Sequence, residues 1–403
     1  MSGNLVITGL GVVAAIGQGQ EAFAAALFEG RHAFGVMQRE GRQRDSAFLG
    51  AEIPALRLPG EVTPRVIRAA SLTSQAALAT VAEAWNDARL AAVDPERIGL
   101  IVGGSNFQQR ASLNEQGAHA GRAEFVNPSY ALSFLDTDVC GFCTSQFGIR
   151  GPSFTVGGAS ASGQLAIIQG ARAVLSGEVD ACIAVGALMD LSHWECQALR
   201  SAGAMGTDRY ASDPSRACRP FDAHRDGFIF GESCGAVVIE AQRPIARREP
   251  YARLLGWGIA MDANRRADPS LDGEVRAIGK ALRMAGLAAA DIDYINPHGS
   301  ASTLGDQTEV AAIRACGLHR ASINATKSIT GHGLTAAGAV EVVATLLQMR
   351  AGRLHPTRNL ETPIDPSLNW IRDRQENHCT RLALTLSIGF GGINTALVLG
   401  SCS

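Results

Sequence analysis

Short apolar runs alternate with longer alanine-rich stretches along the 403 residues of this chain. A short apolar run bounded by glycine or polar residues favours a buried strand, and a longer alanine-rich run favours a helix. Regular alternation of the two predicts a layered α/β protein. In the first part we expect strands at 5–9, 98–103, 181–187 and 237–241, and helices at 66–90 and 160–177.

The second part begins near Tyr251 and repeats this scheme. No low-complexity linker separates the two parts, so we expect one rigid unit made of two similar halves, 1–249 and 250–403. The glycine-rich end, residues 380–400, predicts two strands joined by a turn. The other expected strands are 254–259, 293–296 and 323–326, and the expected helices are 271–288, 307–316 and 335–351.

The composition indicates a globular protein and gives no sign of a nucleic-acid or membrane partner. Hydrophobic residues make up 46% of the chain and charged residues 18%, which is typical of a well-packed globular protein. The net charge of −2 gives no basic field for nucleic acid. We find no leader pattern and no run that approaches the ~18–20 apolar residues of a membrane span, so we expect a cytoplasmic protein with no membrane partner.

The nine cysteines are scattered, and we interpret them as reduced, mostly buried thiols. Cys140 and Cys143 form a C-x-x-C pair, but no second pair completes a zinc set. We therefore expect these two cysteines to be structural and the protein to hold no metal.

Ser160 stands at a predicted strand-to-helix elbow. A β-rich run ends at Gly157-Gly158, and a helix of small residues follows. Unpaired N–H groups and the positive end of the helix dipole favour developing negative charge at such a place. An N-cap role for Ser160 is the alternative.

Two histidines are each expected at the end of a strand beside a glycine: His298 before Gly299, and His332 between two glycines. The helix expected at 335–351 is almost entirely apolar and therefore buried. Its Glu341 needs a partner inside the core. Lys327, in an apolar predicted strand, is the nearest cation in the sequence, so we predict a Lys327–Glu341 ion pair.

A glycine-rich segment, Gly389-Phe-Gly391-Gly-Ile-Asn394, precedes the last strand. A strand rather than a helix follows it, so the dinucleotide-binding fingerprint is not met. We expect a flexible turn whose backbone N–H groups, including that of Gly391, face a bound substrate.

Several collinear motifs spanning the whole chain resemble β-ketoacyl-acyl carrier protein synthases. The resemblance implies a thiolase fold, in which two duplicated βαβαβαββ halves form five αβαβα layers. It also implies an intimate homodimer with residues 151–159 at the interface, and a substrate carried on the phosphopantetheine of an acyl carrier protein with no other cofactor. The motifs are VITGLGVVAAIG, GPSFTV, RPFDAHRDGFIFGE, NPHGSASTLGD, TKSITGHGLTAAGAVE and SIGFGGINTALV.

Motif matching then assigns roles as implications of the resemblance. His298 and His332 match the two active-site histidines, and Lys327 and Glu341 match the lysine and glutamate of the K-S-x-x-G-H segment. Phe390 matches a gating phenylalanine whose backbone N–H joins that of Ser160 in an oxyanion hole.

The remaining matches concern substrate and carrier. Phe228 matches the phenylalanine of an R-D-G-F motif. Ser300 and Ser302 stand where the family usually has two threonines that bind the pantetheine arm. Arg65 and Arg68 match a basic patch that docks acidic carrier proteins.

One departure from the family pattern decides the expected function. The family has roughly T-A-C-[AST]-[ST]-G where this chain has Gly158-Ala-Ser160-Ala-Ser-Gly163. Condensation needs a thiolate, and a serine hydroxyl needs a dedicated base to replace it. Decarboxylation of a malonyl thioester needs only groups that accept enolate charge, here His298 and His332, and an apolar surface such as Phe228.

We therefore predict decarboxylation of malonyl-acyl carrier protein to acetyl-acyl carrier protein. The chain is similar to the serine-bearing decarboxylating ketosynthases of polyketide β-branching (HMG-synthase) cassettes. Three alternatives stay open from the sequence. They are a non-catalytic chain-length partner, a condensing enzyme with an engineered Cys-to-Ser change, and a serine hydrolase, although the last glycine of G-x-S-x-G is missing.

Overall fold

The computed structural model describes residues 5–60, 62–242, 248–265 and 267–402. Two halves repeat one order of elements, βαβαβαββ. In the first half these are β1 (Leu5–Ala14), α3 (Leu72–Ala88), β5 (Ile98–Gly103), α6 (Thr137–Phe147), β6 (Ser153–Val156), α7 (Ser162–Leu175), β7 (Ala181–Gly186) and β9 (Ser233–Ala241). In the second they are β10 (Ala252–Met261), α9 (Leu271–Ala285), β11 (Tyr294–Asn296), α10 (Thr303–Ala315), β12 (Ser322–Ile323), α12 (Ala337–Ala351), β16 (Leu382–Gly389) and β17 (Ile393–Gly400).

The strands of the two halves also lie in the same spatial order. It is β6-β5-β7-β9-β1 in the first half and β12-β11-β16-β17-β10 in the second, and β14 (Asn369–Trp370) extends the second beyond β12. The first three strands of each set are parallel, and the fourth is antiparallel to both of its neighbours, so the fifth again runs parallel to the first three. The sets join where Leu5–Ile7 pairs with Ala252–Leu254.

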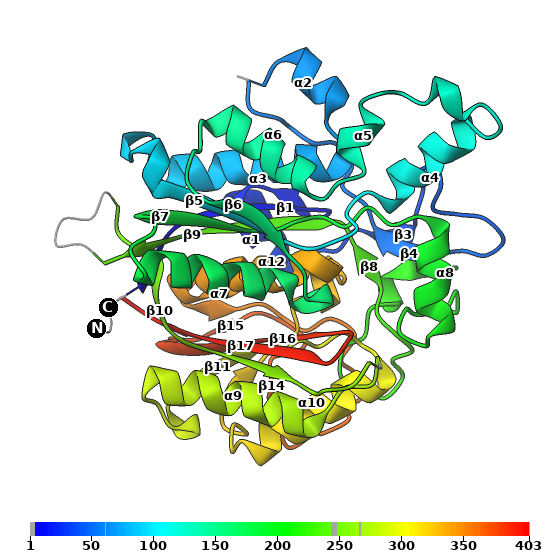
Figure 1. Ribbon diagram of the computed structural model, residues 1–403. Coiled ribbons are helices and arrows are strands. Elements are labelled where there is room, and N and C mark those ends of the chain that lie inside the picture. Colours follow the sequence, from blue (N-terminus) through cyan, green and yellow to red (C-terminus); the bar gives the residue numbers. More distant parts are fainter. Residues whose placement is uncertain (1–4, 61, 243–247, 266, 403) are drawn as a thin grey trace.

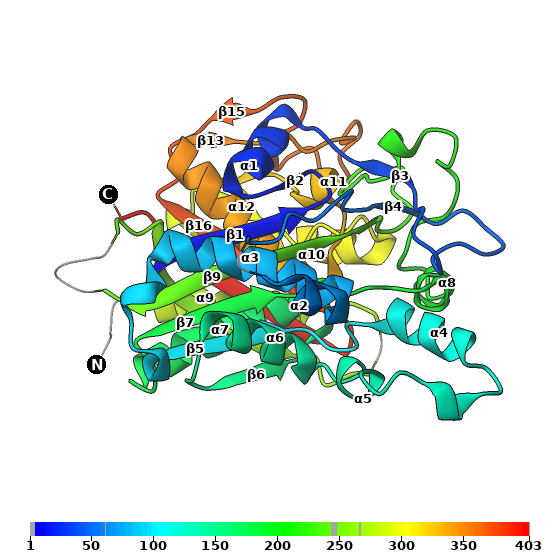
Figure 2. The same ribbon diagram turned by 90° about the horizontal axis from the view of Figure 1, so that it is seen from above.

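The elements stack in five layers, as Figure 1 shows: α3 and α6, the first sheet, α7 and α12, the second sheet, then α9 and α10. Figure 2 shows the same stack from above, with α3 of the outer layer in front of the strands. This architecture confirms the predicted thiolase fold. The smaller elements are β2 (Gly17–Gln18), α1 (Gln20–Glu29), β3 (Phe34–Val36), β4 (Leu49–Ala51), α2 (Pro64–Ala69), α4 (Gln109–Ala118), α5 (Tyr130–Ser133), α8 (His193–Ser201), β8 (Phe230–Gly231), α11 (Lys327–Thr330), β13 (Arg353–Leu354) and β15 (Glu376–Asn377).

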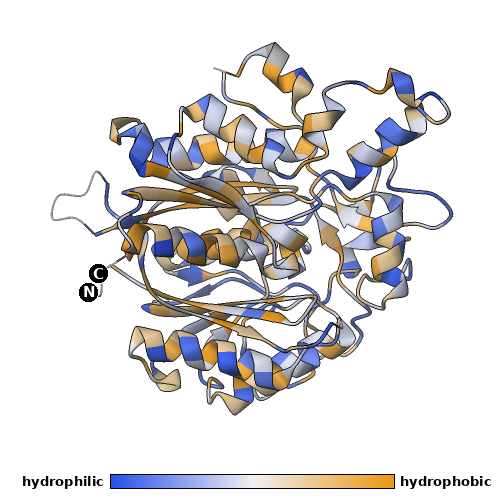
Figure 3. Cartoon of the chain, in the orientation of Figure 1, coloured by the Kyte–Doolittle hydropathy of each residue, from blue (hydrophilic) through white to orange (hydrophobic). Residues whose placement is uncertain are grey.

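The strands of both sheets are mostly orange in Figure 3, whereas α9 on the outside is mixed. Among the described residues, one helical stretch, Leu334–Ala351, reaches the length and mean hydropathy (1.2) of a membrane span, contrary to our expectation for the sequence. Because 83% of it is buried between the sheets, its apolar character is that of a core helix.

The helices α7 and α12 touch through glycines near their first turns. A Cβ on Gly163 would lie 2.6 Å from the backbone nitrogen of Ala339, and one on Gly338 would lie 2.9 Å from Cγ of Gln164. Only a glycine at each position allows this approach. The starts of the two helices are thereby held side by side.

Two local predictions were wrong. The helix expected at 66–90 is broken at Ala70, which is extended, because the Ser71 hydroxyl caps a new helix by accepting the N–H of Ser74. The strand expected at 323–326 ends at Ile323. Lys327 consequently opens the short helix α11, and His332 follows a helical turn instead of a strand.

Candidate active site

A cavity of about 300 Å³ opens between the two halves. Its walls are mainly apolar, with a few polar side chains that come from both halves, which is the usual composition of a substrate site. It brings together most of the predicted site residues: Ser160, Phe228, His298, Ser300, Ser302, His332 and Phe390.

Ser160 lies in a short 3₁₀ turn (Ala159–Ala161) directly before α7. Ala159 has a φ of 46°, a left-handed conformation that an L-residue adopts only under strain. Such strain is concentrated at functional sites. The turn is fixed by Ser162, whose hydroxyl donates to Ala159 O at 2.7 Å and accepts from Gly158 N at 2.9 Å.

The side chains of Ser160 and His332 are hydrogen-bonded, with Oγ 3.0 Å from Nε2. The direction of this bond follows from the other ring nitrogen. Nδ1 of His332 accepts the backbone N–H of Leu334 at 3.3 Å, so the neutral ring carries its proton on Nε2. His332 therefore donates to Ser160, and it is not placed to remove the serine proton.

His298 is held by Lys327. The Lys327 ammonium donates to the backbone carbonyl of His298 and lies 3.4 Å from Nδ1 of its ring. It also forms the predicted ion pair with Glu341, and this pair is fully buried. An ammonium beside Nδ1 leaves the proton of the neutral His298 ring on Nε2. Lys327 and Glu341 do not line the cavity, so they act through His298.

Both imidazoles are neutral. Burial lowers the pKa of His298 and of His332 well below the usual range, and the positive charge of Lys327 lowers both further. The rings meet edge to face with centroids 5.2 Å apart. Phe228 contacts His332 in the same way at 5.1 Å. Within the described residues, no Asp or Glu side chain bonds to either imidazole, so neither ring is oriented as a base.

Two buried carboxyl groups that the sequence analysis did not single out shape the His298 loop. Glu309 accepts the backbone N–H groups of His298 and Gly299, and Asp306 accepts that of Ala301 at 3.0 Å. Burial raises the pKa of Glu309 to about 8 and that of Asp306 to about 6. The signal was present in the sequence, since the two acids lie three residues apart on the buried face of α10.

Ser300 and Ser302 lie at the N-terminus of α10. The Ser300 hydroxyl donates to that of Ser302 at 3.1 Å, and Ser302 caps the helix by accepting from Gly305 N at 3.2 Å. Both line the cavity, and their contact with a substrate arm stays a prediction.

The glycine-rich turn between β16 and β17 closes one side of the cavity. A Cβ on Gly389 would lie 2.4 Å from the carbonyl oxygen of Gly158, so this turn packs against the Ser160 loop. Phe390 lines the cavity and is half exposed, whereas Gly391, predicted to face the substrate, is not among the lining residues. Asp262 anchors the turn by donating its N–H to Gly392 O and accepting from the Asn394 amide, both at 2.8 Å.

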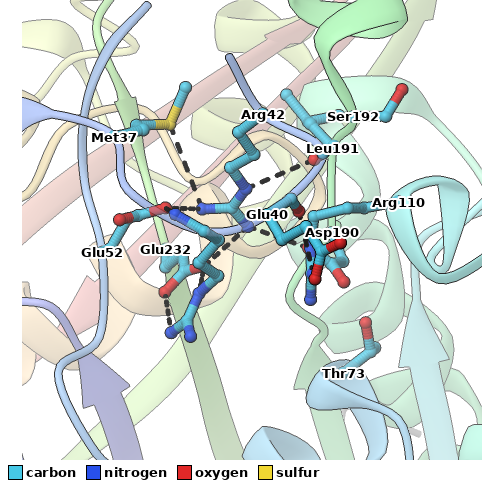
Figure 4. Close-up of polar contacts among 12 residues, drawn as sticks. Met37, Glu40, Arg42, Glu52, Thr73, Arg110, Asp190, Leu191, Ser192 and Glu232 are labelled. Carbon is cyan, nitrogen blue, oxygen red and sulfur yellow. Dashed lines mark hydrogen bonds and ion pairs between the residues drawn. The ribbon is translucent and has the colours of Figure 1, made fainter. Parts of the chain in front are cut away.

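An ion network behind the apolar wall was missed by the sequence analysis (Figure 4). Arg42 is fully buried and pairs with Glu52, Asp190 and Glu232 at 2.6–2.8 Å. Burial alone would raise the pKa of Glu232, but its hydrogen bond from Arg39 and the charge of Arg42 lower it.

This network fixes two parts of the wall. Asp190 follows Met189, a lining residue. The Arg42 guanidinium lies 5.4 Å from the centre of the Phe230 ring. The backbone of Phe230 in turn forms an isolated parallel β-bridge with that of His332. The sequence did contain a signal for this network, because Glu232 is a charged residue inside a strand-like apolar run and so needs a buried partner.

The two arginines predicted to dock a carrier protein lie on α2, in the first half. Arg68 is exposed. The side chain of Arg65 lies outside the described part of the structure.

Comparisons with known proteins agree with this geometry. The model of the β-ketoacyl synthase N-terminal domain matches residues 3–244, and that of the C-terminal domain matches residues 251–361. The polyketide biosynthesis malonyl-ACP decarboxylase PksF of Bacillus subtilis (strain 168) is 58% identical over 398 residues, covering 98% of this chain and 96% of that protein.

Solved structures give the same result. A β-ketoacyl synthase from Burkholderia phymatum STM815 superposes with a TM-score of 0.89 and 27% identity over 100% of both chains. A type II polyketide synthase acyl carrier protein complex with its ketosynthase gives a TM-score of 0.87 and 25% identity, again over 100% of both chains. The chain therefore belongs to the β-ketoacyl synthase family.

Proposed function

We propose that this protein decarboxylates malonyl-acyl carrier protein to acetyl-acyl carrier protein in bacterial polyketide β-branching. The observation that carries this proposal is the pair of neutral histidines, each with its proton on Nε2, beside a serine that accepts a hydrogen bond from one of them. The name of the PksF relative, 58% identical, supports the same reaction.

The cavity suits the loss of CO2 from a malonyl thioester. The thioester carbonyl oxygen accepts hydrogen bonds from the Nε2–H groups of His298 and His332. These bonds stabilise the negative charge that develops on the oxygen as the C–C bond breaks. Phe228 and the other apolar lining residues surround the malonyl carboxylate, which is poorly solvated there. Decarboxylation relieves this penalty because the charged group leaves as neutral CO2. Because both rings are neutral, each has one N–H donor, which the contacts of Nδ1 with Lys327 and with Leu334 N–H leave on Nε2.

The same geometry disfavours acyl transfer through Ser160. A serine nucleophile needs an adjacent base, and His332 presents a donor to this hydroxyl. This argues against both a condensing reaction and a serine hydrolase. The retained histidines and their Lys327–Glu341 support argue against a non-catalytic chain-length partner.

The test is to incubate the pure protein with malonyl-loaded carrier protein and to follow the mass of the carrier. We expect loss of CO2, and a fall in kcat of about 10²–10³ when either His298 or His332 is changed to Ala, because each variant removes one donor to the enolate. The exposed His319→Ala is the matched control and should retain wild-type activity. An unchanged malonyl carrier with wild-type protein would refute the function.

The substrate arm is proposed to be the phosphopantetheine of the carrier, with no further cofactor or metal. Ser300 and Ser302 are positioned at the cavity to contact that arm, and Arg68 is available on the surface for the acidic carrier. We place the reaction in the cytoplasm, where such carriers are loaded.

A homodimer is part of the proposal. Strand β6 is the outer edge strand of the first half's sheet, and its Phe154 is 43% exposed. Leu132 and Phe134, at α5, are more exposed still, at 64% and 54%. An unpaired edge with large apolar side chains is a surface that a second chain covers. Sedimentation should show a dimer that Phe154→Asp weakens, and a monomeric wild type would contradict this part.

A further inference from the structure

We propose that the Ser160 hydroxyl is the acid that protonates the enolate carbon after CO2 has left, and that it does so from one face. This inference rests on the proposed decarboxylation and adds a role for the residue that replaces the nucleophile.

The first argument is the direction of the Ser160–His332 hydrogen bond. Nε2–H of His332 donates to Oγ, so the serine's own proton points elsewhere. Within the described residues, no acceptor for that proton is found, and Ser160 lines the cavity. Two other lining hydroxyls are already committed, since Thr335 donates to Ala187 O at 2.7 Å and Ser300 donates to Ser302.

The second argument is reach. With substrate bound, the Nε2–H of His332 is shared between the enolate oxygen and Oγ of Ser160, which lies 3.0 Å from that nitrogen. The enolate carbon is two bonds from the enolate oxygen, so it can lie within contact of the serine hydroxyl. His298 and His332 cannot take this role while they hold the enolate oxygen.

The step balances without another reactant besides water. The bond between the α-carbon and the carboxylate breaks, CO2 leaves, and the bonding electrons form the enolate. The α-carbon then takes the proton of Oγ–H, the thioester carbonyl forms again, and the serine alkoxide takes a proton from water. The Nε2–H of His332 and the start of α7 stabilise that alkoxide.

The test follows the configuration of the product, because C–C cleavage comes before the proton transfer. The substrate is a malonyl carrier protein whose C2 carries one deuterium and one tritium in a single configuration, turned over in ordinary water. Wild-type protein should give an acetyl group of one configuration.

A matched pair of variants isolates the hydroxyl, since Ser160→Thr keeps it and Ser160→Val replaces it by a methyl group of the same shape. We expect Ser160→Thr to retain the configuration of the product. Ser160→Val and Ser160→Ala should still release CO2 but lose the configuration.

Three results would overturn the assignment. They are a racemic acetyl group from the wild type, the wild-type configuration from Ser160→Ala or Ser160→Val, and no CO2 release from any variant lacking the hydroxyl. If the larger side chains block the cavity, Ser160→Ala decides alone. Failure of the proposed function itself looks different, because the wild type then releases no CO2.

Discussion

Lys327 contacts His298 twice, at its backbone carbonyl and, across 3.4 Å, at Nδ1 of its ring. The lysine thereby fixes both the position and the tautomer of an imidazole that lines the cavity. It is in turn held by Glu341 from the buried helix α12. The ring is thus tied to the buried helix α12 through this ammonium group, while Glu309 holds the backbone N–H of the same histidine.

Replacing Lys327 by Met should lower kcat and reduce stability by about 3–5 kcal/mol, since it leaves the buried Glu341 without its partner. The double variant Lys327→Met, Glu341→Leu should regain stability without regaining activity. In both, the pKa of His298 should rise, because the charge of Lys327 lowers it in the wild type. Denaturant unfolding and the acid limb of the pH–rate profile measure these effects. Full activity in the double variant would contradict a positioning role.

Replacing Arg42 by Met should lower the free energy of unfolding by about 3–5 kcal/mol, because Asp190 and Glu232 would remain buried with fewer partners. The exposed Arg44, which lies 3.8 Å from the exposed Asp45 and 6.0 Å from the centre of the Trp194 ring, is the control. Its change to Met should matter by less than about 0.5 kcal/mol. Equal effects of the two changes in urea unfolding would show that the network does not stabilise the wall.

His355 should make the protein sensitive to acid. Burial lowers its pKa to about 4 from an ordinary value of 6.5, so the unfolded chain binds the proton more readily. The contribution of neutral His355 to the free energy of unfolding is fully present above pH 6.5. It is lost at up to about 1.4 kcal/mol per pH unit as the pH falls to about 4. The difference in unfolding free energy between wild type and His355→Gln should shrink over this range. His319→Gln, at an exposed site, is the control variant.

Changing Arg68 to Glu should raise KM for malonyl carrier protein, because an exposed cation is reversed on the proposed docking surface. The effect should weaken with added salt and should be absent with a small malonyl thioester that has no carrier. The exposed Arg320→Glu serves as the control. An equal rise in KM for both substrates would place Arg68 at the cavity instead.

The periodic pattern of the sequence predicted a layered α/β chain of two similar halves and a buried Glu341 that needs a partner, because each depends on burial that the pattern records. The five layers were implied by the family resemblance, and Lys327 was chosen as the nearest cation in the sequence. The break at Ala70 was missed, since the continuous apolar pattern outweighed the capping signal of Ser71. Lys327 was assigned to a strand because a run of four residues carries little periodicity, and the tertiary position of α11 decides its conformation.

The site was predicted less completely than the fold. The reactive residues carry motif signals, but the Arg42 network joins positions 42, 52, 190 and 232, and their approach depends on the tertiary fold. The direction of the Ser160–His332 bond was likewise beyond the sequence, because it depends on Leu334 N–H reaching Nδ1.

The helices α7 and α12, which touch through Gly163 and Gly338, hold equivalent places in the order of elements of the two halves. Ser160 stands before one of these helices and His332 before the other. Because both places belong to one chain, nothing requires their residues to be identical, and a hydroxyl at one place can meet an imidazole at the other.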